Sequence, residues 1–174
     1  QGGIQALSRS YLGKIIPAEQ SGEYYGLMDI CGKGASFLGT TLVAALIRGK
    51  KATVVNVGDS RLYHVSPGQI RQITRDHSLV QIMLSRGELS KEQIRNYPGK
   101  NLITRAIGTE PVVQCDLFHK ELKRGDCLLL CSDGLSGLMD DQEILFEVVH
   151  GINKQYCCQR LLDIAKNRGA PDNV

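Results

Sequence analysis

Two short apolar runs in this chain each stop at an aspartate beside a glycine. Residues 52–57 read ATVVNV and lead into the turn Gly58–Ser60, and residues 127–131 read CLLLC and lead into the turn Ser132–Gly134. Runs of this length and apolar content form buried strands. The sequence therefore predicts a carboxylate at the end of each of two strands. A third acidic turn, Asp172-Asn173, lies near the end of the sequence.

These acidic turns have two readings. Aspartate offers hard oxygen atoms that suit Mg²⁺ or Mn²⁺, and glycine lets a ligand approach the backbone closely. Asp-Gly and Gly-Asp pairs are also among the commonest turn residues in any protein. One such turn alone favours the second reading, whereas several of them behind apolar runs favour a metal site.

Six segments occur in an order that is typical of one protein family. They read LGTTLVAALI (38–47), NVGDSRLY (56–63), ITRDHSLV (73–80), NLITRAIGTE (101–110), GDCLLLCSDGL (125–135) and DNV (172–174). Each segment alone is a weak signal, but together they resemble the motif series of the metal-dependent protein phosphatase 2C family in its bacterial form. The resemblance runs from about Leu38 to the last residue.

The resemblance implies a serine/threonine phosphoprotein phosphatase that uses two Mn²⁺ or Mg²⁺ ions and a water they activate, with no serine or cysteine nucleophile. Carried over by motif, Asp133 and Asp172 are the expected metal ligands. Asp59 matches a position that helps to hold a third, weaker metal ion together with Asp133. The implied partners are phosphoprotein substrates and a cognate serine/threonine kinase.

The sequence also departs from the family pattern. The family's two amino-terminal motifs, Arg-x-x-Asn-Glu-Asp and Asp-Gly-Met-Gly-Gly, are absent. The segment MDICGKG (28–34) is a poor copy of the second, because Ile30 follows Asp29 and because it lies too close to Gly39 to leave room for the family's helix. Apolar residues recur at helical spacing in residues 1–16, which are predicted to be that helix.

We therefore expect a domain truncated at both ends, and a poor catalyst in these 174 residues alone. A different class of function stays open, a non-catalytic phosphatase-like module that binds phosphoproteins or regulatory partners. An Asp-Gly-x-Gly-Gly loop encoded upstream of Gln1 would favour the enzyme.

The expected fold is α+β, with two packed antiparallel sheets flanked by helices in a four-layer sandwich. Turn residues between apolar runs predict three hairpins, which pair 40–47 with 52–57, 61–65 with 70–74, and 112–122 with 127–131. Asp140 and Glu143 form a predicted capping box at the start of one helix, and Gly169 ends another.

Residues 76–110 are polar and helical in pattern and match the flap subdomain of the family. Ser90 and Gln93 are a predicted capping pair there. His77 is either an acid for the leaving group or a residue at the start of a helix. Three basic residues of the segment either contact a phosphopeptide or are solvated: Arg86, Arg95 and Lys100.

Length and composition fit a single domain over 1–174, because 42% of the residues are apolar and can form a sizeable core. The net charge of +3 is small and the basic residues are dispersed, so no nucleic-acid partner is expected. No segment is apolar enough to span a membrane. The six cysteines lack disulfide or zinc spacing, which predicts buried, reduced thiols in a cytoplasmic protein.

Overall fold

The computed structural model describes residues 39–94, 97–110 and 112–169, and these form two three-stranded antiparallel sheets with helices. The first sheet has the order β1-β2-β5, and its strands are β1 (Leu42–Arg48), β2 (Lys51–Val57) and β5 (Asp116–Glu121). The second has the order β4-β3-β6, and its strands are β3 (Arg61–Ser66), β4 (Gln69–Gln72) and β6 (Cys127–Cys131). The helices are α3 (Leu79–Ser85), α4 (Lys91–Ile94), α5 (Asp133–Ser136), α6 (Asp141–His150) and α7 (Lys154–Asn167).

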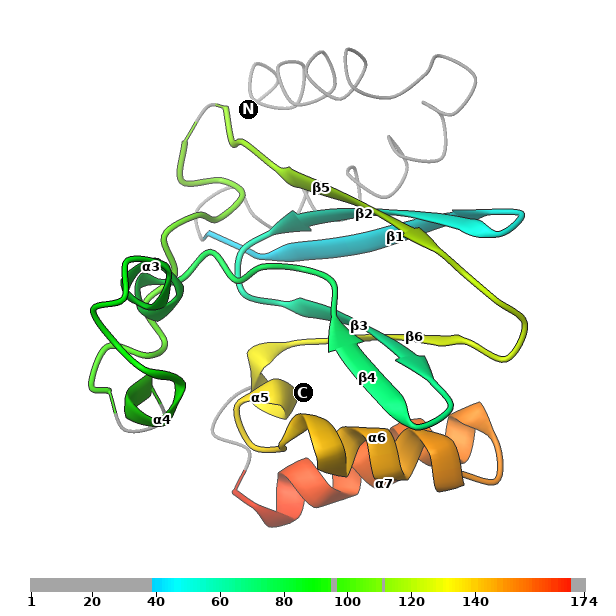
Figure 1. The fold of residues 1–174 in the computed structure, drawn as a ribbon. Helices are drawn as coiled ribbons and strands as arrows, with labels where there is room; N and C mark the ends of the chain where they lie inside the picture. Colours follow the sequence, from blue (N-terminus) through cyan, green and yellow to red (C-terminus); the bar gives the residue numbers. More distant parts are fainter. Residues whose placement is uncertain (1–38, 95–96, 111, 170–174) are drawn as a thin grey trace.

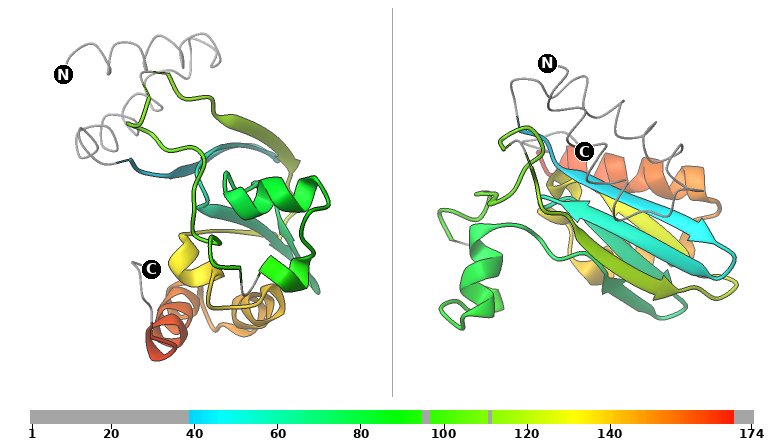
Figure 2. Two further views of the ribbon diagram at one scale, coloured as in Figure 1. Left: turned by 90° about the vertical axis from the view of Figure 1, so that its left-hand side faces the viewer. Right: turned by 90° about the horizontal axis from the view of Figure 1, so that it is seen from above.

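The two sheets lie one above the other, and α6 and α7 cover the outer face of the second sheet (Figure 1). The core beneath β3 joins the strand side chains Tyr63 and Val65 to Ile144 of α6 and Leu161 of α7, all of them at most 3% exposed. The short helices α3 and α4 lie beside the sheets at one end of the molecule (Figure 2). The predicted α+β class, with two packed antiparallel sheets and helices outside, is confirmed.

Two of the three predicted hairpins are confirmed. Strand β1 pairs with β2 from Arg48↔Lys51 to Leu42↔Val57, and β3 pairs with β4 from Ser66↔Gln69 to Tyr63↔Gln72. Gly49 and Gly68 occupy the two turns with positive φ, which glycine adopts without steric cost.

The third predicted hairpin is wrong, because β5 and β6 belong to different sheets. Strand β5 pairs with β2, whereas β6 pairs with β3. The short connection between them crosses from one sheet to the other. Asp126 holds this connection in place, because its carboxylate contacts His64 Nε2 at 2.8 Å and accepts a hydrogen bond from the Lys123 backbone N–H at 2.8 Å.

The predicted helix ends are confirmed. The capping box at α6 has both of its bonds, between Asp140 and Glu143 in each direction. Gly169 follows α7 with a φ of 93°. The Ser90 backbone N–H donates to the Gln93 side chain at the start of α4.

Some sequence predictions lie outside the described residues, among them the helix in 1–16 and the segment 28–34.

Five cysteines are described, and all five are free thiols. Only Cys157 of these is buried and Cys158 is exposed, so the prediction of buried thiols holds for one of the five. Among the described helices, none is both long and apolar enough to cross a membrane.

Candidate metal site

Strand register brings Asp59 and Asp133 together. Strands β3 and β6 run antiparallel, and their last pair at this end is Arg61↔Cys131. Asp59 lies two residues before Arg61, and Asp133 lies two residues after Cys131. Continuing the antiparallel register by two residues therefore places the two aspartates opposite each other and on the same face.

A tight turn at Gly58 brings the chain from β2 to Asp59. Gly58 is buried and has a φ of 103°. A Cβ atom at this position would lie 2.3 Å from Cγ2 of Thr41, so no side chain fits. The side-chain amide of Asn56 donates to the Gly58 carbonyl at 3.3 Å and to the Arg75 carbonyl at 3.0 Å. These two hydrogen bonds stabilise the turn.

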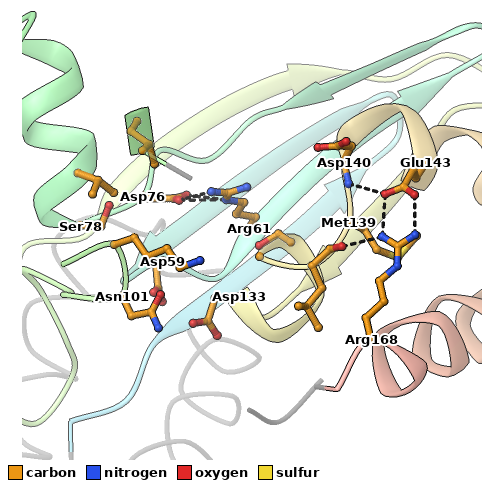
Figure 3. Close-up of a pocket in the computed structure, with 16 residues that line it drawn as sticks. Asp59, Arg61, Asp76, Ser78, Asn101, Asp133, Met139, Asp140, Glu143 and Arg168 are labelled. Atoms are coloured by element: carbon orange, nitrogen blue, oxygen red, sulfur yellow. Dashed lines mark hydrogen bonds and ion pairs between the residues drawn. The ribbon is translucent and has the colours of Figure 1, made fainter. Parts of the chain in front are cut away.

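Asp59 and Asp133 line one pocket of about 610 Å³. The two carboxylates face the same space, with Asn101 close to Asp59 (Figure 3). The other side chains around the pocket come from several elements. Its charged residues include Arg61, Asp76, Lys100, Asp140, Glu143 and Arg168. The pocket lies where the β2–β3 turn, the start of α5 and the 76–110 segment meet.

Burial and acidic neighbours both act on the Asp59 carboxyl. Burial raises the pKa of the Asp59 carboxyl, and the nearby charges of Asp133 and Asp76 raise this pKa further. Each of these effects disfavours the ionised carboxylate. A cation between Asp59 and Asp133 would reverse the effect by stabilising both charges.

Arg61 and Asp76 form a fixed ion pair in the pocket wall. The Arg61 Nε donates to both oxygens of Asp76 at 3.0 Å, and Nη2 donates to Oδ2 at 2.6 Å. Gln72 donates to the same carboxylate, and Arg61 Nη1 donates to the hydroxyl of Tyr63. Burial alone would lower the pKa of Arg61, but the bonds to Asp76 outweigh it and raise that pKa. These hydrogen bonds hold the Arg61 guanidinium in a fixed position in the pocket wall.

A second ion pair forms another part of the wall. Arg168, just past the end of α7, donates to both oxygens of Glu143 at 2.9 and 2.6 Å and to the Leu138 carbonyl at 2.7 Å. Glu143 also accepts the backbone N–H of Asp140. Arg168 thus ties the end of α7 to the start of α6 (Figure 3).

The structure places the other predicted residues as follows. Asp172 and Arg95 lie outside the described residues. Lys100 lines the pocket, whereas Arg86 is exposed near Glu88 and does not. His77 is buried, directly precedes the cap of α3 at Ser78, and does not line the pocket.

Sequence reasoning assigned no role to Arg61, Asp76, Glu143 or Arg168 at this site. The signal for the first two was present, because both stand inside the quoted motifs NVGDSRLY and ITRDHSLV. No sequence pattern indicates that the end of α7 reaches the start of α6.

The two facing carboxylates fit a hydrated divalent cation. Mg²⁺ in proteins is held by one or two carboxylates and keeps several waters. Among residues 39–94, 97–110 and 112–169, no cluster of three or more His, Cys, Asp or Glu side chains could hold a metal ion. Asp59 and Asp133 are the described candidate ligands that the sequence motifs indicate.

Two family models match the sequence. The model described as protein phosphatase 2C matches residues 33–82, and the one described as vacuole effluxer Atg22 like matches residues 1–52. Neither covers half of the chain. The first includes the β1 to β3 region and Asp59, whereas the second falls mostly on residues that the structure does not describe.

Several known proteins of similar sequence and structure are serine/threonine phosphatases. The chain is 46% identical over 107 residues to the serine/threonine phosphatase stp of Listeria welshimeri, which covers 62% of this chain and 42% of that protein. It matches the structure of the serine/threonine phosphatase Stp1 from Staphylococcus aureus with a TM-score of 0.76 and 32% identity, covering 90% of this chain and 66% of that one. It matches the catalytic domain of the phosphatase PstP in complex with two manganese ions with a TM-score of 0.69 and 35% identity, over 85% of this chain and 60% of that one.

The curated relative of Listeria is thus matched over less than half of its own length. The motif order, the two-sheet fold and these similarities agree on one conclusion: the chain belongs to the protein phosphatase 2C family.

Proposed function

We propose that this chain is part of a phosphatase that hydrolyses phosphoserine and phosphothreonine in proteins with the help of Mn²⁺ or Mg²⁺. The observation that carries the proposal is the Asp59–Asp133 pair, two carboxylates from different strand ends that face one pocket. The phosphatase relatives, one of which binds two manganese ions, support the same chemistry.

We take the proposed roles from the family motifs that the sequence resembles. On this proposal Asp133 and Asp172 hold the principal metal ions, and Asp59 shares a third ion with Asp133. A bound divalent ion supplies positive charge and Lewis acidity, which is the chemistry that phosphate-ester hydrolysis by water requires. The Arg61–Asp76 pair keeps the pocket wall rigid, so that the carboxylates need not reorganise when an ion or a phosphate enters.

The 76–110 segment is proposed as the flap of this site. Its two ends are held together, because Leu79 N–H donates to the Leu102 carbonyl and Thr104 N–H donates to the His77 carbonyl. Lys100, on this segment, reaches the pocket and is a candidate contact for a phosphopeptide. Phosphoproteins, a cognate serine/threonine kinase and a cytoplasmic location belong to the same proposal, and the five free cysteines support a reducing compartment.

Phosphate release from a phosphothreonine peptide, with and without Mn²⁺, tests the proposal. It is measured on the 174-residue chain and on the complete product of its gene, because the amino-terminal family motifs are absent from these 174 residues. We expect metal-dependent release by the complete product and little by the 174 residues alone. Asp133→Asn should lower the rate roughly 100-fold or more, since it removes a charge that holds the metal.

Asp163→Asn is the matched control, because Asp163 lies on α7 and does not line the pocket. Its activity should equal that of the unsubstituted protein. A complete product that binds a phosphopeptide but never releases phosphate would instead support the non-catalytic module. Near-normal activity of Asp133→Asn at modest Mn²⁺ would eliminate the metal assignment.

A further inference from the structure

His77 makes two hydrogen bonds to Gly58, the residue before Asp59. Its backbone N–H donates to the Gly58 carbonyl at 2.9 Å, and the Gly58 backbone N–H donates to the His77 ring at Nδ1, at 3.1 Å. The His77 side chain is only 6% exposed. The turn that presents Asp59 is therefore bonded on both of its backbone polar groups to one buried histidine.

The contacts of the ring fix its protonation pattern. Because Nδ1 accepts a hydrogen bond from Gly58, it carries no proton, and in the neutral ring the proton lies on Nε2. Nε2 faces Oδ2 of Asp116 at 3.2 Å, which accepts that proton's hydrogen bond. Arg105 Nη1 lies 3.3 Å from the same nitrogen and bonds instead to the other oxygen of Asp116, at 3.0 Å.

Asp116 is suited to this role because it stays ionised. Burial raises its pKa, but the hydrogen bonds from His77 and Arg105, together with the charge of Arg105, outweigh burial and lower that pKa. Asp116 lies at the start of β5, and it pairs with Asn56 of β2. The ring thus connects the Asp59 turn to the first sheet as well as to the base of the 76–110 segment.

We propose that His77 is a positioning residue for Asp59, whose ring holds the Gly58 turn so that the Asp59 carboxylate faces Asp133. The inference rests on the proposed function for the use of that carboxylate. Its physical basis is the chain of bonds from Asp116 through the ring to Gly58. Residues that orient a metal ligand through hydrogen bonds usually affect metal affinity as well as stability.

Two substitutions separate the two ends of the ring. His77→Asn keeps an acceptor near the place of Nδ1 and loses the donor at Nε2, whereas His77→Gln keeps a donor near the place of Nε2 and loses the acceptor. We expect His77→Gln to weaken Mn²⁺ binding about 10- to 100-fold and His77→Asn to weaken it less. Mn²⁺ binding is measured by electron paramagnetic resonance, and the melting temperature is measured beside it.

His119→Gln is the matched control, because His119 is an exposed histidine of β5 whose ring contacts Thr53. It should leave Mn²⁺ binding unchanged. If the losses of affinity in both His77 variants simply followed their losses in melting temperature, the positioning role would be refuted. Equal affinity of His77→Gln and the unsubstituted chain would refute it as well.

Nuclear magnetic resonance tests the inference without metal or activity. The Nδ1 signal of His77 should be that of an unprotonated nitrogen coupled to the Gly58 amide, and the Asp59 carboxyl signal should shift in His77→Gln but not in His119→Gln. A proton on Nδ1, or an unchanged Asp59 signal, overturns the inference. Failure of the unsubstituted chain to bind Mn²⁺ would count against the proposed function alone.

If neither His77 variant folds, Asp116 provides the second test. Asp116→Asn retains an oxygen that can accept from Nε2, whereas Asp116→Ala does not. The Asp59 carboxyl signal should shift in Asp116→Ala and remain closer to its original position in Asp116→Asn. Equal shifts in both would overturn the inference.

Discussion

We expect Asp59 to destabilise the metal-free protein at neutral pH. Burial and the charges of Asp133 and Asp76 raise its pKa above the ordinary value of 3.8, so the folded protein holds this proton more tightly than the unfolded chain does. Stability is therefore lost as pH rises from 3.8 through the folded pKa. Asp59→Asn removes this loss, and we expect a higher melting temperature at pH 7 in chelator, with the gain disappearing below pH 3.8.

Thermal unfolding of both proteins across pH 3 to 7 checks this expectation. The same substitution should lower the activity of the complete gene product, with the larger loss on a phosphopeptide than on p-nitrophenyl phosphate, because in the proposed function the peptide would also engage the 76–110 segment. A lower melting temperature with unchanged activity on both substrates would make Asp59 an ordinary turn residue.

Gly58 is required by both its backbone angle and its surroundings. Its φ of 103° disfavours any other residue, and an added Cβ would lie 2.3 Å from the Thr41 side chain. We expect Gly58→Ala to lower the free energy of unfolding by roughly 2–5 kcal/mol, from left-handed strain and overpacking together. Gly68→Ala is the control, because Gly68 has a φ of 75° with no atom within 4 Å of the added Cβ. Urea unfolding should show a loss of only about 1–2 kcal/mol there, and equal losses at both sites would contradict the role of Thr41.

At the scale of elements, α6 and α7 are joined by the Glu143–Arg168 pair. The hydrogen bonds from Arg168, followed by the Asp140 backbone N–H, lower the pKa of Glu143 from 4.5 to about 2. The ionised form therefore stabilises the fold above pH 4.5, and this stabilisation is lost as pH falls toward 2. Glu143→Gln should lower the melting temperature at pH 7 by a small amount, because the pair is partly exposed and screened by salt.

The melting-temperature difference between Glu143→Gln and the unsubstituted protein should shrink as pH falls below 4.5. Glu147→Gln is a suitable comparison, since Glu147 pairs with Arg160 over the longer distance of 3.4 Å. Glu147→Gln should lower the melting temperature at pH 7 by less than Glu143→Gln does. A difference for Glu143→Gln that stays constant from pH 7 to pH 3 would show that the charge of Glu143 contributes nothing.

Secondary structure followed closely from local sequence, but the pairing of strands did not. Turn residues and helix caps act between neighbouring residues, so the first two hairpins, the Asp140 capping box and the Gly169 stop were predictable. The segment 123–126 has the same turn-like composition, yet it connects two sheets. Strand β5 pairs with β2 and β6 pairs with β3, and no local signal distinguishes these long-range partners from each other.

At the scale of the whole molecule, the motifs identified the aspartates but not their arrangement. Asp59 and Asp133 are 74 residues apart, and only the register of β3 with β6 makes them neighbours. Likewise, His77 had no visible sequence partner, because Gly58 and Asp116 approach it only through folding. Sequence therefore indicated two of the carboxylates that line the pocket, while the hydrogen bonds that support them required the structure.

The whole-molecule consequence of a metal site is that Mn²⁺ should stabilise the fold. A ligand that binds only the folded state adds about 2.7 kcal/mol at a concentration of 100 times its dissociation constant, which for a chain of this length corresponds to roughly 5–10 °C. We expect a chelator to lower the melting temperature by this amount and added Mn²⁺ to restore it. In Asp133→Asn the chelator should have little effect, because the Asp133 carboxylate that would bind the ion together with Asp59 has lost its charge. In Asp163→Asn the chelator should lower the melting temperature as it does in the unsubstituted protein. Differential scanning calorimetry at fixed pH and ionic strength measures all three, and an equal response of Asp133→Asn would show that Mn²⁺ binds elsewhere.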